Sequence, residues 1–162
     1  MARIYGKRFD PSTWKPDPTI IRAGRFSIEE VMPYIITPQQ IRDLKTFGYK
    51  RSDEFWDSLV HHDFNGHSVR MDKKRYQLFA TLPLECAHCK MKGEYFCLER
   101  QGTDQSNDKF YLHLYGTHPE HGEMRLTMDH IHPLREGGTS SFRNLQILCS
   151  LCNHVKAHSF EY

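Results

Sequence analysis

The sequence predicts an α+β protein, with a small, mostly helical N-terminal region followed by a strand-turn-strand-helix core that four cysteines staple. Three observations predict this class. Helix-capping residues precede short apolar segments in the first half of the chain. Alternating apolar and polar residues, typical of strands, follow residue 95. Two Cys-x2-Cys pairs flank that second stretch, so we expect an N-terminal arm and helical region over residues 1–71 and a stapled domain over residues 72–162.

The first element is an arm. Residues 1–26 contain three closely spaced prolines, and we expect them to form an extended arm or loop. Ser27 and Glu30 have the spacing of a capping box, in which each residue satisfies a free backbone donor at the start of a helix. The helix that they predict is short and stops near Pro33, because proline disrupts a helix interior.

Two further helices are predicted before the core. Thr37 is the expected N-cap of the first, which ends at Gly48, and the second begins near Ser52. Asn65-Gly66 then forms a turn. The first helix places Ile41, Leu44 and Phe47 on one face, and the second carries Phe55, Trp56, Leu59 and Val60. Such a pair is either a helix-turn-helix that reads DNA or a pair packed on the domain behind it, and the absence of a DNA-reading pattern favours packing.

The core elements follow in order. Asp72 is the expected cap of a helix over Lys73 to Leu82. The predicted strands and turns are a brief strand over His67 to Met71, strands over 95–100 and 109–115 joined by the loop Gly102 to Asp108, a turn over His118 to Gly122, and a strand over Glu123 to Met128.

The cysteine pairs predict a structural zinc site. Cys86-x2-Cys89 and Cys149-x2-Cys152 supply four thiolates, the ligand set of a closed tetrahedral zinc centre. A redox pair would need a βαβ context, and a zinc deaminase would need His-x-Glu with Pro-Cys-x2-Cys, and neither pattern is present. Cys97 lies in an apolar run and is expected to be a small buried residue.

A second group of residues surrounds the end of the third strand. Asp129 is a hard oxygen ligand, and His130 points to the opposite side of an extended backbone. Gly137-Gly138 permits a reversal, and Asn144 enters a second apolar strand. Ser150 can cap a final helix that carries Asn153 in its first turn. This order predicts a strand-turn-strand-helix unit in which Asp129 and Asn153 converge.

These motifs resemble those of the HNH endonuclease family, whose core is a ββα-metal fold. The motifs D-H-I-x-P, G-G, N-L-Q-x-L-C and C-N-x-x-K stand in the family's order between residues 129 and 156. The flanking cysteine pairs look like those of phage-borne HNH proteins. The resemblance covers roughly residues 72–160, about half of the chain, and implies that 72–162 is a zinc-stapled HNH nuclease domain.

The resemblance also implies residue roles. His130 would be the general base that activates water, and Asn144 would fix the hairpin that orients it. Asp129 and Asn153 would hold one catalytic Mg²⁺ or Mn²⁺. The family often has histidine at the third position, and Asn153 there favours a hard, oxygen-ligated ion. His132 is a further candidate catalytic residue, and it either contacts the metal or phosphate or only packs.

The function that follows is a metal-dependent endonuclease that cleaves or nicks DNA, leaving a 5′-phosphate and a 3′-hydroxyl. RNA is a less favoured substrate, and the alternative function is a non-catalytic, zinc-stabilised nucleic-acid-binding module of the same fold. The net charge is only +2, but residues 1–25 and 66–92 each carry six Lys and Arg residues against two acidic residues. These two basic segments fit either a surface that contacts phosphates or an ordinary solvated surface. Residues 1–71 are a candidate DNA-contacting extension.

No apolar stretch reaches the roughly 20 residues of a membrane span. We therefore expect a cytoplasmic protein, in the host cytoplasm if phage-encoded; the pattern leaves the target and the oligomeric state open.

Overall fold

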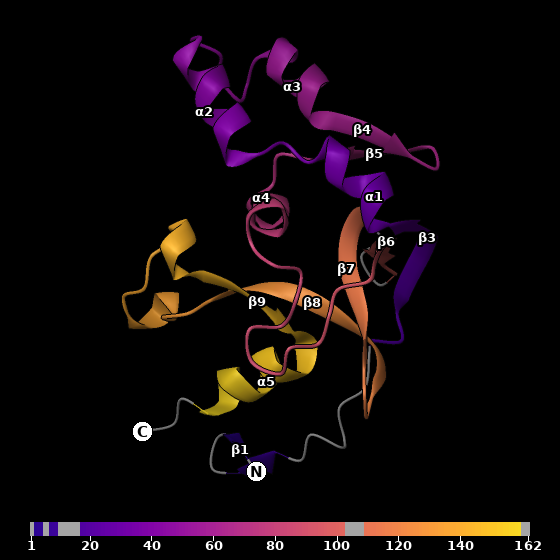
Figure 1. Ribbon diagram of the computed structural model, residues 1–162, viewed down its shortest axis with the longest axis vertical. Helices are drawn as coiled ribbons and strands as arrows, with labels where there is room; N and C mark the ends of the chain where they lie inside the picture. The colour runs from indigo at the N-terminus through magenta and orange to yellow at the C-terminus, as the bar shows by residue number, and fades with distance from the viewer. Residues whose placement is uncertain (1, 5–6, 10–16, 103–108, 160–162) are drawn as a thin grey trace. The chain divides into compact units, whose positions relative to one another are not determined.

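The computed structural model describes residues 2–4, 7–9, 17–102 and 109–159 (Figure 1). Contacts between residues divide the chain into two compact units. Unit 1 combines residues 1–18, 84–94 and 113–162, and unit 2 combines residues 19–83 and 95–112. The expected division between residues 71 and 72 stays a prediction, because these units are defined by contacts alone. Mixed helix and sheet in both units confirm the α+β class.

Unit 1 is built around an antiparallel sheet in which β8 lies between β7 and β9. The helix α5 contacts both β8 and β9, and Figure 1 shows it beside these strands. Buried apolar side chains fill the sheet, notably Leu114, Met124, Leu126 and Ile147. The elements of this unit are β1 (Ala2–Ile4), β2 (Lys7–Phe9), β7 (Tyr111–His118, from His113 onward), β8 (Gly122–His130), η3 (Leu134–Glu136), η4 (Phe142–Asn144), β9 (Leu145–Cys149) and α5 (Ser150–Ser159).

Unit 2 combines an antiparallel strand pair, a hairpin and short helices. Strand β3 pairs with β6, and β4 pairs with β5. Its largest fully buried side chains include Trp56, Tyr76 and Phe96. The elements are β3 (Ile20–Ser27), α1 (Ile28–Val31), η2 (Met32–Tyr34), α2 (Pro38–Thr46), α3 (Glu54–Val60), β4 (His61–Phe64), β5 (His67–Arg70), α4 (Lys74–Thr81) and β6 (Tyr95–Gln101).

Two of the predicted helix caps and the predicted turn after α3 are present. The Ser27 hydroxyl accepts a hydrogen bond from Glu30 N at 3.2 Å, and the Glu30 carboxylate accepts one from Ser27 N at 2.7 Å. Thr37 and Gln40 form the same reciprocal pair at the start of α2. The predicted turn at Asn65-Gly66 joins β4 to β5, and both residues have positive φ angles, 52° and 83°. Two successive positive φ angles fit the primed turns that suit hairpins.

Three predictions in unit 2 are wrong. Ile20–Ser27 is strand β3 rather than part of a loop, because it pairs with β6 far along the chain. Asp72 does not cap α4, whose N-cap is Lys73; its buried carboxylate instead accepts hydrogen bonds from Trp56 Nε1 and Arg70. Phe47 is 79% exposed although it was placed on the face of Ile41, because it follows the last turn of α2. The prediction that the second helix carries Phe55, Trp56, Leu59 and Val60 is confirmed by α3, in which Trp56 and Val60 are buried and Phe55 and Leu59 are exposed.

Two remaining predictions concern the connections. The loop expected over Gly102 to Asp108 lies, from residue 103, outside the described residues. The turn expected over His118 to Gly122 is present between β7 and β8. Among the helices that the structure describes, none combines the length and apolar character needed to cross a membrane.

Candidate metal centre and active site

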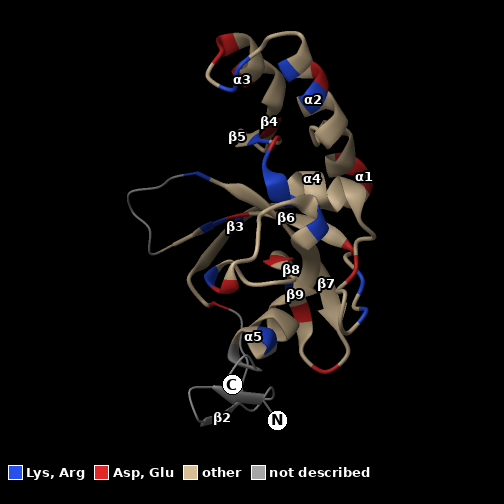
Figure 2. Ribbon diagram, turned by 90° about the vertical axis from the view of Figure 1, so that its left-hand side faces the viewer, with Lys and Arg blue, Asp and Glu red and all other residues tan. Residues whose placement is uncertain are grey.

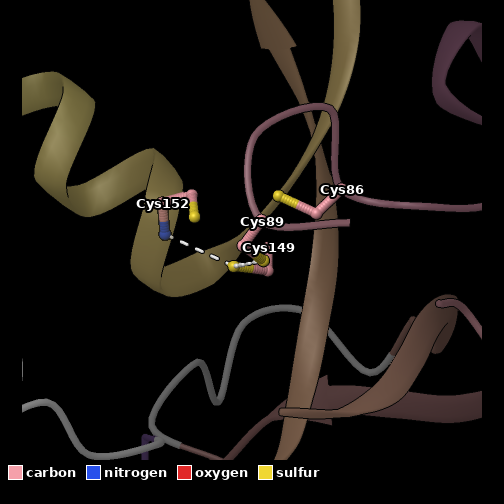
Figure 3. Close-up of side chains that lie close together, drawn as sticks. All are labelled: Cys86, Cys89, Cys149 and Cys152. Carbon is pink, nitrogen blue, oxygen red and sulfur yellow. Dashed lines mark hydrogen bonds between the residues drawn. The ribbon is translucent and has the colours of Figure 1, made fainter. Parts of the chain in front are cut away.

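The four paired cysteines meet in unit 1. Cys86 and Cys89 lie on the loop before Met91, Cys149 ends β9, and Cys152 lies in the first turn of α5 (Figure 3). Their sulfur atoms all lie within 4.8 Å of one another, and the Sγ atoms of Cys89 and Cys149 are 3.8 Å apart. A tetrahedral centre with Zn–S bonds of about 2.3 Å places its sulfurs about 3.8 Å apart. The cluster therefore has the spacing of a four-thiolate zinc site.

Backbone hydrogen bonds shape the loop that carries the first pair. Cys86 N donates to Met91 O at 2.9 Å, and Lys90 N donates to Cys86 O at 3.0 Å. Lys90 has a φ of 65°, which lets the chain turn tightly after Cys89. Ala87 N donates to Ile147 O at 2.8 Å and ties the loop to β9. These bonds bring the two cysteine pairs together although 59 residues separate them.

The pKa values of three of the thiols are shifted in different directions. A hydrogen bond from Cys149 lowers the pKa of Cys86 to about 4, despite the opposing effect of burial. The same hydrogen bond raises the pKa of Cys149, and burial is the main cause that raises the pKa of Cys152 to about 12. Several adjacent thiolates repel one another unless a cation is present, so this set fits a divalent, thiophilic ion. Cys97 is buried in β6 and lies outside the cluster.

Asp129, His130 and Asn153 line a second site in unit 1. A cavity of about 270 Å³ is lined by these three side chains and by Arg135 and Lys156, among others. Asp129 and His130 are the last residues of β8, and Asn153 comes from the first turn of α5. Because β9 runs directly into α5, the pairing of β8 with β9 fixes the distance between strand end and helix start. The predicted convergence of Asp129 and Asn153 is therefore seen as a shared cavity.

The side-chain atoms of Asp129 and Asn153 differ in their hydrogen bonds. Asp129 Oδ2 accepts hydrogen bonds from Gln146 Nε2 at 2.8 Å and Lys156 Nζ at 2.5 Å. Asn153 Nδ2 donates to Thr127 Oγ1 at 3.1 Å. Within the described part of the chain, neither Asp129 Oδ1 nor Asn153 Oδ1 has a hydrogen-bond partner. The site thus presents one carboxylate oxygen and one amide oxygen, the donors that Mg²⁺ and Mn²⁺ prefer.

Asn144 holds together the connection between β8 and β9. Its Oδ1 accepts from His132 N at 2.8 Å, and its Nδ2 donates to His132 O at 2.9 Å and Thr139 O at 2.7 Å. Gly138 packs against the same strand end, where a Cβ atom would lie 2.0 Å from His132 O. His130 Nε2 lies 3.1 Å from Ser140 Oγ. One amide side chain therefore fixes the backbone that follows His130.

His132 is placed differently from His130. Its side chain is 56% exposed, its Nε2 lies 3.9 Å from Glu136 Oε2, and it is not among the residues that line the cavity. Its backbone N and O are the groups that Asn144 binds. A role of its imidazole in catalysis stays a prediction.

The contacts of Lys156, Thr127 and Gln146 with the residues of this site were not predicted from the sequence. From the sequence, Lys156 is either a phosphate contact or, more simply, a solvated lysine. In the structure its side chain is only 18% exposed and contacts Asp129 and the carbonyl oxygen of His130. Its spacing of three residues from Asn153 placed it on the same helix face, which was the available signal. Thr127 and Gln146 carried no signal of their own, because their contacts depend on the strand register.

The class of domain follows from these features. β8, β9 and α5 form a ββα unit whose strand end and helix start present hard oxygen ligands and a histidine to one cavity. Residues 117–159 match the HNH endonuclease family model, and this segment is an HNH domain, as its motifs predicted. The match begins inside β7 and ends with α5. No curated protein and no solved structure matches the chain.

Proposed function

We propose that the protein is a metal-dependent HNH endonuclease that cleaves or nicks the phosphodiester bonds of DNA. The match to the family supports a nuclease-type function in general. The observation that carries the finer proposal is the cavity that Asp129, His130 and Asn153 line together. Its volume of about 270 Å³ and its position at the end of β8 suit a phosphate group rather than a large, enclosed ligand.

Asp129 and Asn153 are the proposed ligands of one Mg²⁺ or Mn²⁺. Their Oδ1 atoms fit a hard cation, and two protein ligands leave positions for substrate oxygens and water. When bound there, such a cation supplies positive charge that stabilises the phosphoryl oxygens and the leaving 3′-oxygen. Lys156 adds a positive charge next to Asp129 and so lowers the net negative charge that a phosphate meets.

His130 is the proposed general base. Imidazole is the side chain most often used as a general base, and here it would accept a proton from the attacking water. Its Nε2 is within hydrogen-bond distance of Ser140, which can fix the ring orientation. Asn144 is the proposed positioning residue, because it fixes the backbone immediately after His130. The products are expected to be a 5′-phosphate and a 3′-hydroxyl.

Zn²⁺ is the proposed structural ion of the cysteine cluster. Four thiolates with about tetrahedral spacing form a closed site, which suits structural rather than catalytic zinc. Cys149 and Cys152 bracket the joint between β9 and α5, so the ion would fix the helix start from which Asn153 projects. We expect about one zinc ion per chain.

Cleavage of supercoiled plasmid DNA tests the nuclease proposal. Wild-type protein should produce nicked or linear DNA with Mg²⁺ or Mn²⁺, and His130→Ala should reduce the rate by at least about a hundredfold, the scale of general-base catalysis. His121→Ala is a matched control, because His121 lies in the turn at the other end of β8. Equal cleavage by wild type and His130→Ala would refute the assignment of the base. His132→Ala in the same assay decides whether that imidazole takes part.

The second candidate function is a non-catalytic, zinc-stabilised nucleic-acid-binding module. The ion pair of Lys156 with Asp129 favours it, because an ammonium group there neutralises the carboxylate without a metal. Binding to DNA without cleavage across Mg²⁺, Mn²⁺, Ni²⁺ and Zn²⁺ would support this candidate. Cleavage of RNA instead of DNA would keep the chemistry and change the substrate.

The helices of unit 2 are a less direct candidate for DNA contact. Figure 2 shows both basic and acidic residues on α2, whereas α3 carries Glu54 and Asp57 but neither Lys nor Arg, so this helix pair is not uniformly basic. Across the two helices and the segment between them, the residues are Arg42, Lys45, Lys50 and Arg51 against Asp43, Asp53, Glu54 and Asp57. A DNA-contacting extension within residues 1–71 therefore stays a proposal that rests on the basic N-terminal segment.

A further inference from the structure

We infer that Thr127 and Gln146 are positioning residues that determine which oxygen each proposed metal ligand presents to the cavity. The inference rests on the proposed function. Neither residue lines the cavity, and each donates to or accepts from a single ligand residue. Their hydrogen bonds explain why Asp129 and Asn153 both present Oδ1 to the cavity.

Thr127 orients the amide of Asn153. Its hydroxyl donates to Leu148 O at 3.1 Å and therefore offers its lone pairs to Asn153 Nδ2, which donates to it at 3.1 Å. An amide has one donor end and one acceptor end, so a partner that can only accept selects the orientation. Only the amide oxygen can bind a hard cation, and this orientation leaves that oxygen unused by Thr127.

Gln146 orients the carboxylate of Asp129. It stands opposite Asp129 in the pairing of β8 with β9, and its Nε2 donates to Oδ2 at 2.8 Å. Lys156 contacts the same oxygen. Because both donors converge on Oδ2, Oδ1 is left to the cavity. Gln146 also lines an apolar hollow together with Leu148 and Leu151, which restricts its side chain.

The pairing of β8 with β9 places the contacts of Thr127 and Gln146 next to each other. Thr127 and Asp129 are two residues apart on β8 and so point to the same face of the sheet. Their partners in β9 are Leu148 and Gln146, also two apart. Hydrogen-bonded neighbours of metal ligands usually change metal affinity by about 10- to 100-fold when they are removed. The two positions are therefore expected to affect cation binding more than folding.

Binding of Mn²⁺ to the zinc-loaded protein, followed by electron paramagnetic resonance, tests the inference. Thr127→Val keeps the shape and branching of the side chain but removes the hydrogen-bond acceptor, and we expect Mn²⁺ binding to weaken by about tenfold or more. Thr127→Ser keeps the hydroxyl and should bind within about twofold of wild type. The same order should appear in the Mn²⁺ concentration that gives half-maximal cleavage, with the maximal rate largely recovered at high Mn²⁺.

Gln146→Leu is the second variant, and it keeps the test valid if Thr127→Val does not fold, as judged by zinc content and circular dichroism. Leucine suits the apolar hollow, and we expect the same weakening of Mn²⁺ binding. If both variants bind Mn²⁺ as wild type does while Asn153→Ala does not, the inference is overturned and the proposed cation site stands. If wild-type protein binds no Mn²⁺, both are overturned.

Discussion

Replacing Asn144 by aspartate is the sharpest single perturbation of the HNH core. The two side chains have nearly the same shape, so the change exchanges one NH₂ group for an oxygen and little else. In the native protein that NH₂ group donates to His132 O at 2.9 Å and to Thr139 O at 2.7 Å. In Asn144→Asp, a carboxylate oxygen would face both carbonyl oxygens at these distances.

The expected cost follows from these contacts. A hydrogen bond contributes about 0.5–1.5 kcal/mol net, so two lost bonds reduce the free energy of unfolding by about 1–3 kcal/mol. Repulsion between the carboxylate and the two carbonyl oxygens adds to this loss, while water at the half-buried site reduces it, and we expect about 2–3 kcal/mol in total. Asn144→Ala loses three hydrogen bonds but lets water reach the carbonyl groups, so it should cost no more than Asn144→Asp.

Urea unfolding and amide hydrogen exchange measure the two parts of this effect. Exchange should accelerate at His132 N and Ile131 N, which donate to Asn144 Oδ1 and O. Protonation restores one donor to the new carboxyl group. Because the folded protein disfavours the carboxylate, the pKa of this group lies above the ordinary value for aspartate, and the deficit of Asn144→Asp should shrink as the pH falls toward about 4. Cleavage should fall together with local stability. An Asn144→Asp variant that is as stable as wild type at pH 7 would refute the role assigned to this amide.

Three further predictions concern other parts of the molecule. Asp72→Asn should destabilise unit 2 by about 3 kcal/mol at pH 7, because it removes the buried partner of Arg70. Burial opposes ionisation of Asp72, but Arg70 and Trp56 lower its pKa overall. The stability that the Asp72 carboxylate contributes is therefore present above pH 3.8 and is lost as the pH falls through the folded-state pKa. Urea unfolding should show a smaller difference in stability between wild type and Asp72→Asn at pH 3 than at pH 7. Cys149→Ala should lose its zinc by elemental analysis and unfold unit 1, whereas Cys97→Ala should keep it. Ser140→Ala should lower the plasmid cleavage rate by less than about tenfold and change its pH profile, since Ser140 Oγ lies 3.1 Å from Nε2 of His130.

Local chemistry explains which features the sequence could predict. Capping boxes act over three residues, so Ser27 and Thr37 predict helix starts without knowledge of the fold. The cysteine pairs predict a shared zinc site because thiolates at this spacing have few other uses in one chain. The HNH motifs predict the ββα unit, and residues 117–159 match the model of that family.

Long-range pairing explains what the sequence could not predict. Strand β3 is defined by β6, which follows it by about 70 residues, and its own residues alternate poorly because of the irregularity between Arg22 and Gly24. Asp72 has the position of a cap, but a buried carboxylate gains more from Arg70 and Trp56. The contacts of Lys156, Thr127 and Gln146 likewise require the register of β8 and β9.

The joint between β9 and α5 connects the two clusters of unit 1. Cys149 and Cys152 lie on either side of the helix start, and Asn153 follows Cys152 directly. The carbonyl group of Leu148, one residue before Cys149, accepts the hydrogen bond from Thr127 that orients Asn153. A shift of this joint would therefore move a cysteine ligand, an orienting carbonyl and a proposed catalytic ligand together. For that reason the cysteine cluster is better understood as the support of the cavity than as a separate stabilising site.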